Sequence, residues 1–391
     1  MKNLWTVLPP PLSENFGFAE ILEHSDGCGI VDDSGSYRLG SSRDNRHSFH
    51  NAAPEETPVR RPEAHRKHGG RGGLRTLVSG ADEADVIHGT REKLMETFQN
   101  AYTALSPAFA LFCAGPCGAM IGTDLGEIAE TVSRQFDIPA AAVDISGQKA
   151  YDVGISKTLE AMVRLLPRDA SPIPGTVNIL GATRHDWDEA DVKGVADWVS
   201  GQGFRVLACP GAQVTAEQMA RMGSAQYNLV VTVAGLAAAK TLQARFGTPY
   251  LCMSPFGTGA ASHIQAQSTW AAHPSLPADT LVISEQFAAN AVREAVERKS
   301  IGNGADVATF FLLDRTCARE GDRRIRSEDE ASALLNGPKY RCIIADPLLR
   351  PLLKRDCRWI DLPHRALNLY KDTVTVSLLG SNMDNWLETN G

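Results

Sequence analysis

Short apolar runs alternate with longer amphipathic segments along most of the 391-residue chain. In the clearest stretch, the runs at 109–112 and 140–145 are typical of strands. The segments at 123–136 and 153–166 have the apolar spacing of helices. Strands separated by helices of this length pair in parallel, because the helix carries the chain back across the sheet. The pattern therefore predicts a doubly wound α/β fold.

The same alternation continues beyond two loose stretches, a Pro-rich break at 171–175 and a second break at 268–278. Strand-like runs follow the first break at 177–180, 205–209, 229–233 and 250–253, and the second at 281–283, 307–312 and 342–345. The chain is thus expected to form three successive Rossmann-like units with parallel sheets. Their predicted boundaries are 1–168, 169–268 and a smaller third unit at 269–391.

One segment of the first unit, 53–73, is dominated by Pro, Gly and charged residues and has no apolar period. Such a composition favours a flexible surface insertion. The alternative to a flexible insertion is a basic patch that binds an acidic partner or an anionic substrate.

Composition limits the classes of function. The net charge of −7 does not favour a nucleic-acid binder, and no run of 18 apolar residues predicts a membrane span. We read no signal peptide at the N-terminus. The eight cysteines are scattered, mostly within apolar runs, which fits a reducing cytoplasm and not a disulfide framework.

Several common motifs are missing. The run 154–158, Gly-Ile-Ser-Lys-Thr, looks like the tail of a Walker A loop but lacks the glycines that such a loop needs. The dinucleotide fingerprint Gly-x-Gly-x-x-Gly and the nucleophile elbow Gly-x-Ser-x-Gly are absent as well. We therefore expect no ATP bound by this chain, and dehydrogenase and hydrolase functions lose support.

A cysteine-containing turn lies between the run 109–112 and the helix expected near Thr123. It carries Cys113 and Cys117, and open α/β sheets bind ligands where strands end. A thiol at a helix N-terminus is shifted toward the thiolate that binds metal. Met120 stands where a third cysteine of a Cys-x-x-x-Cys-x-x-Cys motif would be, so a cluster would need a further ligand. The alternative is that both cysteines are small core residues.

The best distant donor is the turn formed by Gly27, Cys28 and Gly29, which is followed by Asp32 and Asp33. This turn would bring a thiolate and backbone N–H groups to a cluster, and the aspartates would add oxygen ligands. A free turn cysteine beside solvated aspartates is the alternative.

These motifs resemble those of the nitrogenase component 1 family. The family includes nitrogenase molybdenum-iron protein-like and dark-operative protochlorophyllide reductase-like subunits, and the chain looks like a divergent member of it. The order and spacing of the motifs support the resemblance more than any single motif does. The matching runs are His24-Ser-Asp-Gly-Cys28, Glu83-Ala-Asp85-Val-Ile-His-Gly89, Cys117-Gly-Ala-Met-Ile121-Gly122-Thr123-Asp124, Asp144-Ile-Ser-Gly147 and Phe246-Gly-Thr-Pro-Tyr250.

The resemblance implies a reductase core that pairs with a sister component 1-like subunit and receives electrons from a separate ATP-hydrolysing iron–sulfur reductase. It implies an iron–sulfur cluster shared with the sister subunit. By the resemblance, Cys28 and Cys117 are the matched metal ligands, with Cys113 as a substitute. The residues expected beside a cofactor are Gly27, Gly29, Arg38, Gly118 and Cys252.

The family also has a second metallocofactor, held by a Cys and a His of later domains. Cys252 and His364 are the positional candidates for these ligands, and His364 is the candidate catalytic residue. A second metallocofactor in this chain is left open.

The chain departs from the family pattern in three ways. The spacing from Cys117 to Ile121 is one residue shorter than usual, and the family's first cysteine has no counterpart near 13–17. In an alternative register Ser36 takes the place of the Gly-Cys cysteine, which would make Cys28 incidental and leave the cluster altered or absent.

Three hypotheses follow from the sequence. The first is a subunit of a nitrogenase-like reductase that acts on a small molecule or a tetrapyrrole. The second is a catalytically inactive scaffold or assembly subunit, which the missing first cysteine favours. The third is an unrelated small-molecule binding protein with a cleft between its lobes.

Overall fold

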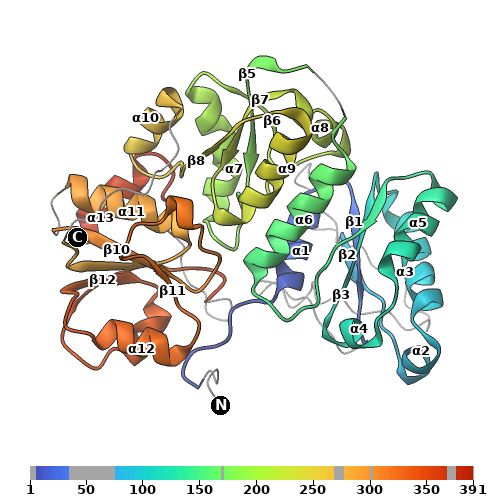
Figure 1. Cartoon of the computed structure of the whole chain (residues 1–391), viewed down its shortest axis with the longest axis horizontal. Coiled ribbons are helices and arrows are strands. Elements are labelled where there is room, and N and C mark those ends of the chain that lie inside the picture. The colour runs from blue at the N-terminus through green and yellow to red at the C-terminus, as the bar shows by residue number, and fades with distance from the viewer. Residues whose placement is uncertain are drawn as a thin grey trace, which may run out of the picture.

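The computed structural model describes residues 6–34, 75–168, 171–267, 277–299, 303–367 and 376–390. In these residues the strands form three sheets, and all strands within them pair in parallel. Helices cover the sheets, as Figure 1 shows, and the predicted α/β class is confirmed. The insertion expected at 53–73 lies outside the described residues, and the domain boundaries near 168 and 268 stay predictions.

The first sheet has the strand order β2-β1-β3-β4. Its strands are β1 (Cys28–Asp32), β2 (Thr76–Val78), β3 (Ala110–Ala114) and β4 (Ala140–Ala142). The helices of this part are α1 (Glu14–Glu23), α2 (Glu83–His88), α3 (Arg91–Leu105), α4 (Pro116–Ile121), α5 (Leu125–Phe136) and α6 (Tyr151–Leu165).

The second sheet has the order β6-β5-β7-β8. Its strands are β5 (Ile173–Leu180), β6 (Arg205–Ala208), β7 (Ala225–Val230) and β8 (Tyr250–Cys252). Its helices are α7 (Glu189–Gly201), α8 (Ala216–Ala220), α9 (Leu236–Phe246) and α10 (Gly259–Ala266), with short 3₁₀ turns η2 (Met222–Ser224) and η3 (Val233–Gly235).

The third sheet has the order β11-β10-β9-β12-β13. Its strands are β9 (Thr280–Ile283), β10 (Ala305–Thr309), β11 (Arg323–Arg324), β12 (Cys342–Ala345) and β13 (Arg358–Asp361). Its helices are α11 (Gln286–Arg298), α12 (Glu328–Asn336) and α13 (Asn382–Asn390), with 3₁₀ turns η4 (Arg315–Cys317) and η5 (Pro347–Leu352).

The helix expected at 123–136 is preceded by a separate short helix. Gly122 ends α4 with a φ of 77°, a conformation that glycine adopts without steric cost. Asp124 then starts α5, because its side chain accepts a hydrogen bond from the backbone N–H of Glu127. Cys117 therefore lies inside a helical turn of its own.

Side-chain caps mark the starts of α7, α8 and α12. The Thr215 hydroxyl and the Gln218 side chain form a capping box at the start of α8. The side chains of Asp188 and Ser327 accept backbone N–H groups at the starts of α7 and α12. These caps explain where the three helices begin.

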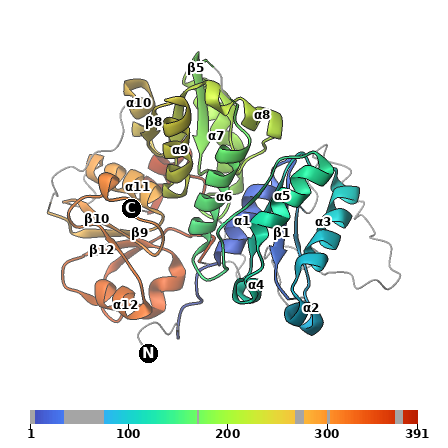
Figure 2. The ribbon, with the colours of Figure 1, turned by 45° about the vertical axis from the view of Figure 1, so that its right-hand side comes forward.

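One hydrophobic core joins the three sheets. It contains buried residues of each sheet, such as Leu111, Leu229 and Ile343, and side chains of α1 and α6. A second cluster fills the other face of the first sheet, beneath α3 and α5. Figure 2 shows α1 and α6 between the first sheet and the other two. Among the described helices, none has the length and apolar character needed to cross a lipid bilayer.

The helices α1 and α6 touch through two glycines. A Cβ at Gly17 would lie 2.0 Å from the Tyr151 carbonyl oxygen, and a Cβ at Gly154 would lie 1.8 Å from the Glu14 carbonyl oxygen. Real Cβ atoms do not approach backbone this closely, so each glycine permits the contact. The close packing of α1 on α6 thus explains why glycine stands at position 154. Lys157, from the same run, forms an ion pair with Asp144.

We predict that Gly154→Ala separates α1 from α6 and lowers the midpoint of thermal unfolding. The loss of stability is about 1–3 kcal/mol, the usual cost of overpacking a core. Gly201→Ala is the matched control, because this exposed helical glycine has nothing within 4 Å of an added Cβ and alanine favours helix. Equal unfolding midpoints for the two variants would contradict the close contact.

Candidate functional site

The first candidate site lies at the carboxyl edge of the first sheet. The strands β1 and β3 are parallel neighbours, and Asp32 at the end of β1 pairs with Ala114 at the end of β3. The loops that follow both strands therefore meet. There the backbone N–H of Cys117 donates to Oδ2 of Asp33 at 3.0 Å.

Two glycines let the Cys117 turn pack directly on the end of β1. A Cβ at Gly115 would lie 2.0 Å from Asp33 Oδ2, and a Cβ at Gly118 would lie 2.0 Å from the Asp32 carbonyl oxygen. A side chain at either position would push α4 off the sheet. Gly118, expected beside a cofactor, thus has a packing role, and its contact with a cofactor stays a prediction.

Asp32 is the centre of a buried polar network at this edge. Its carboxylate accepts hydrogen bonds from Ser79 Oγ at 3.2 Å and Thr90 Oγ1 at 2.8 Å, and Thr90 contacts Thr123 at 2.6 Å. Burial raises the pKa of Asp32, while the hydroxyl donors act against that rise. We did not predict Ser79 or Thr90 from the sequence. Ser79 comes directly after β2, and Thr90 comes directly before α3.

The three candidate thiols lie in different environments. Cys117 is half-buried, whereas Cys113 is fully buried against α1, where Asn15 Nδ2 lies 3.5 Å from its sulfur. Cys28 is also fully buried, on the opposite face of the sheet with Ile30. Burial raises the pKa of Cys113 and raises that of Cys28 to about 12, so both favour the neutral thiol.

The structure does not bring Cys28 and Cys117 together. Cys28 is the first residue of β1, and Cys117 contacts Asp33, just beyond the last residue. At about 3.3 Å per residue, the length of the strand separates them by ~16 Å. The neighbouring Gly27 and Gly29 are explained by packing, since a Cβ there would meet the rings of Phe109 and Phe18. Arg38 and Ser36, the residue of the alternative register, lie outside the described residues.

We tested whether these residues fit an iron–sulfur cluster. Such clusters usually take four ligands, mostly cysteine thiolates. At this edge the described part of the chain offers the half-buried Cys117 thiol and the Asp33 carboxylate. This donor set fits one corner of a cluster shared with another chain. It does not fit a cluster held by the described residues alone.

A group of three potential metal ligands, Glu20, Glu23 and His24, lies in and beside α1. However, Glu20 accepts the backbone N–H of Arg184, and the Arg184 guanidinium lies 2.8 Å from His24 Nδ1. A fixed positive charge at this distance disfavours a cation.

The second candidate site lies where the three sheets meet, around Asp186. Asp186 follows β5 and accepts hydrogen bonds from the hydroxyls of Tyr151, at the start of α6, and Thr183. His364, which follows β13, places Nε2 at 3.4 Å from Asp186 Oδ1. These groups come from all three parts of the chain, and several follow the carboxyl end of a strand.

His364, the predicted catalytic residue, is enclosed. It is 1% exposed and stacks on Phe311 with 4.8 Å between ring centres. Its backbone N–H donates to Asp346 at 2.6 Å, while neither ring nitrogen has a hydrogen-bond partner among the described residues. The ring lies against the Phe311 ring and the Asp186 carboxylate, and its catalytic role stays a prediction.

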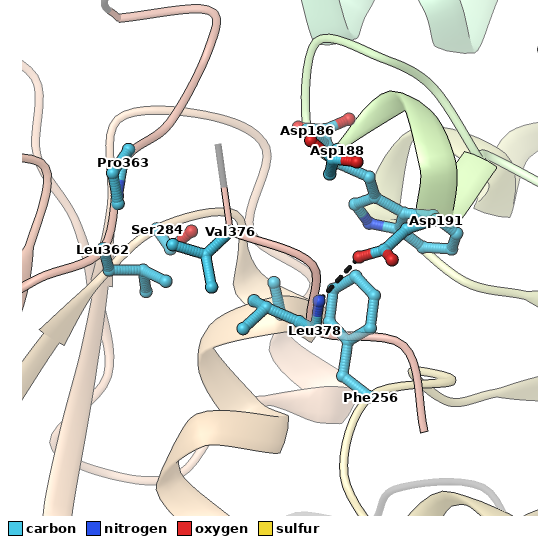
Figure 3. A pocket seen from close by; sticks show the side chains of 11 residues that line it. Asp186, Asp188, Asp191, Phe256, Ser284, Leu362, Pro363, Val376 and Leu378 are labelled. Atoms are coloured by element: carbon cyan, nitrogen blue, oxygen red, sulfur yellow. Dashed lines mark hydrogen bonds between the residues drawn. The ribbon is translucent and has the colours of Figure 1, made fainter. Parts of the chain in front are cut away.

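A small pocket opens beside this site, as Figure 3 shows. Asp186, Asp188 and Asp191 line one side, and Leu362 and Pro363 the other. The three carboxylates already accept hydrogen bonds from the chain: Asp186 from Tyr151, Asp188 from the N–H of Ala190, and Asp191 from the N–H of Leu378. Each carboxylate that lines the pocket is thus already engaged by the chain itself.

Two further carboxyl groups are buried at this junction. Asp152 in α6 accepts the backbone N–H of Leu312, and Glu285 before α11 accepts that of Val233 at 3.0 Å. Burial, with the nearby charge of Asp186 adding to it, raises the pKa of Asp152 to about 6 and that of Glu285 to about 8. Glu285 therefore keeps its proton near neutral pH, whereas Asp152 keeps its proton only below about pH 6.

Cys252, the other positional candidate for a cofactor ligand, ends β8 and is buried. The contacts that the structure describes for His364 are with Asp186, Phe311, Tyr151 and Asp346. No contact described in the structure joins the two candidates, and their roles as ligands stay predictions.

Three parallel sheets that meet at one junction define a class of three-lobed α/β proteins, and comparisons with known proteins agree. Residues 64–266, a little over half of the chain, match the family described as nitrogenase component 1 type oxidoreductase. The chain belongs to this family, as a divergent component 1-like member.

Curated relatives match part of the chain. It is 30% identical over 195 residues to a subunit of the light-independent protochlorophyllide reductase of Rhodopseudomonas palustris (strain BisB5), a match that covers 45% of this chain and 35% of that protein. It is 27% identical over 194 residues to the nitrogenase iron-molybdenum cofactor biosynthesis protein NifE of Klebsiella pneumoniae, covering 46% and 42%. The matches thus span well under half the length of either relative.

The fold has a similar solved structure. Nitrogenase Cp1 at pH 6.5 matches with a TM-score of 0.65 at 13% identity, over 100% of this chain and 90% of that one. The likeness supports the fold at this identity and carries no argument about chemistry.

We predict that Asp152 and Glu285 contribute stability that is lost as the pH rises from about 4 to 8. A carboxyl group with a raised pKa keeps its proton in the folded state at a pH where the unfolded chain has lost it. At these two groups the folded state binds more protons in this window, so the stability that they contribute falls as the pH rises. For Asp152 the shift from 3.8 to about 6 corresponds to at most about 3 kcal/mol. Asp152→Asn should therefore flatten the pH dependence of the urea midpoint between pH 4 and 6.

The control for this prediction is Asp144→Asn. Asp144 is exposed and pairs with Lys157, which lowers the pKa of its carboxyl group. This variant should leave the loss of stability with rising pH unchanged. An unaltered pH profile in Asp152→Asn would contradict the raised pKa.

Proposed function

We propose that the chain is one subunit of a nitrogenase-like reductase complex. In this complex it pairs with a sister component 1-like subunit, receives electrons from a separate ATP-hydrolysing iron–sulfur protein, and contributes to reducing a small molecule or a tetrapyrrole. The observation that carries the proposal is the half-buried Cys117 on the glycine-lined turn at the carboxyl edge of the first sheet. Membership of the family and the similarity to a protochlorophyllide reductase subunit support it.

In this proposal Cys117 is the ligand that the chain gives to an iron–sulfur cluster shared with the sister subunit. The cluster would store and pass on electrons. The chain's own residues position the thiol: Asp33 holds the Cys117 backbone N–H, and Gly115 and Gly118 allow α4 to approach β1. The cytoplasm is the compartment that we propose, because all eight cysteines are in the reduced thiol form.

The test is anaerobic purification of the complex through a tag on this chain, followed by iron and sulfide analysis. We expect iron in the wild-type complex and a severalfold loss of iron in Cys117→Ala, because that variant removes a ligand at the subunit contact. Cys28→Ala is the matched control and should keep its iron, since Cys28 is buried at the other end of β1. A wild-type complex without iron, or equal iron in Cys117→Ala, would overturn the proposal.

A second candidate function is a scaffold or assembly subunit that holds a metal cofactor without turnover. The single half-buried thiol at the described edge and the similarity to a cofactor biosynthesis protein favour it. The two functions differ in one measurement, the reduction of protochlorophyllide or another acceptor by the purified complex with an ATP-dependent electron donor. Turnover supports the reductase, and bound iron without turnover supports the scaffold.

A further inference from the structure

A short extended segment before α1, residues 6–12, joins the third lobe to the first. The third lobe is the part of the chain that forms the third sheet, and we call the segment the N-terminal strap. At one end, the Leu12 carbonyl oxygen accepts the backbone N–H of Tyr151, at the start of α6, at 2.8 Å. At the other end, the strap contacts Glu328, the first residue of α12. Figure 1 shows the blue N-terminal chain running from the side of α12 toward α1.

The Glu328 carboxylate holds four donors of the strap. Its Oε2 atom accepts the backbone N–H groups of Thr6, Val7 and Leu8 at 3.0, 2.8 and 2.9 Å. Its Oε1 atom accepts the Thr6 hydroxyl at 2.6 Å. Successive N–H groups that converge in this way form an anion-binding concavity, and hydrogen bonds to a charged acceptor are the strong ones.

These hydrogen bonds keep the carboxylate charged. The bond from the Thr6 hydroxyl, together with those from the three N–H groups, lowers the pKa of Glu328 to about 2. The contact between the strap and α12 is therefore fully formed at neutral pH.

The strap between its two anchors is stiff. Its residues 9–11 are three consecutive prolines, whose rings fix φ and favour the extended polyproline conformation. Leu8 and Leu12, on either side of the prolines, are each 6% exposed and pack into the main core. A stiff segment with both ends bound holds α12 at a fixed distance from the start of α6.

A second connection ties the third lobe to the second sheet. The backbone N–H of Leu378 donates to Asp191 of α7 at 2.7 Å, and that of Thr258 donates to Asp384 of α13 at 2.7 Å. Asp384 also pairs with Arg298 of α11. Figures 1 and 2 show α11 on the face of the third sheet opposite α12. The C-terminal tie and the N-terminal strap thus hold opposite faces of the third lobe.

The junction that the third lobe covers is polar and costs free energy to close. Asp152 Oδ1 and both ring nitrogens of His364 are buried with no hydrogen-bond partner among the residues that the structure describes. Burial also disfavours the charged forms of Asp152 and Glu285. Water that entered this junction would hydrate all of these groups, so their burial favours opening.

We propose that the N-terminal strap is a clamp that holds the third lobe closed over the junction around Asp186. Release of Glu328 from the strap lets the lobe move about its C-terminal tie and admits water to the junction. The proposal does not depend on the function proposed above, because it concerns the placement of the third lobe and not a cluster or a substrate.

Hydrogen–deuterium exchange of the full chain at neutral pH tests the clamp. The amides of residues 6–8 should be protected in the wild type. In Glu328→Ala they should exchange about tenfold faster or more, because hydrogen bonds to a charged acceptor are lost. The Leu312 and Val233 amides, which donate to Asp152 and Glu285 at the junction, should also exchange severalfold faster. Amides of α3 and α5, on the far face of the first sheet, should not change.

The matched control is Asp329→Asn. Asp329 is exposed and is the next residue of α12, so this variant removes a charge from the same helix terminus without touching the strap. It should exchange like the wild type at residues 6–8, 233 and 312. Thr6→Val, which removes only the hydroxyl donor, should give a smaller effect of the same kind and serves as the test where Glu328→Ala does not fold.

Four results would overturn the proposal. The first is unprotected amides at residues 6–8 of the wild type. The second is a freed strap in Glu328→Ala with wild-type exchange at Leu312 and Val233, which would make the strap a passive segment. The third is equal acceleration in α3 and α5, which would indicate general destabilisation. The fourth is the same acceleration in Asp329→Asn, which would assign the effect to the helix terminus.

Discussion

The structure depends on the close contact of α6 with elements from every part of the chain. Gly154 allows α1 to touch α6, and Tyr151, fully buried at the start of the same helix, donates to Asp186 and packs on Phe311. One helix therefore fixes the first sheet against the second and the third. Because a single core continues through this contact, a change in α6 affects the placement of all three sheets.

The two candidate sites follow from the same topology. Parallel strands collect their carboxyl ends at one edge of each sheet, and the first sheet brings Asp32, Asp33 and Cys117 together in this way. At the junction, the loops after β5, β9 and β13 bring Asp186, Glu285 and His364 together. The first site offers one half-buried thiol, which suits a partner that completes it, while the second is closed by the chain's own side chains.

Much of the fold was predictable because the period of apolar residues reflects burial directly. The parallel α/β class was predicted and is confirmed. The extra helix α4 was missed, since six residues that include a proline and a glycine carry no readable period. The tight contacts of Gly154 were missed as well, because a sequence does not state which backbone a glycine must approach.

The sequence by itself determined the class of fold, the membership in the nitrogenase component 1 family and the small set of thiols and carboxyl groups with which the chain works. Only the tertiary structure decided which of them meet. It set Cys28 apart from Cys117, because Cys28 begins β1 and Cys117 lies against Asp33 beyond the other end of that strand. It placed His364 beside Asp186, because the segments that follow β13 and β5 meet at the junction. Local patterns fix which elements form, whereas the packing of sheets fixes distances between residues far apart in the chain.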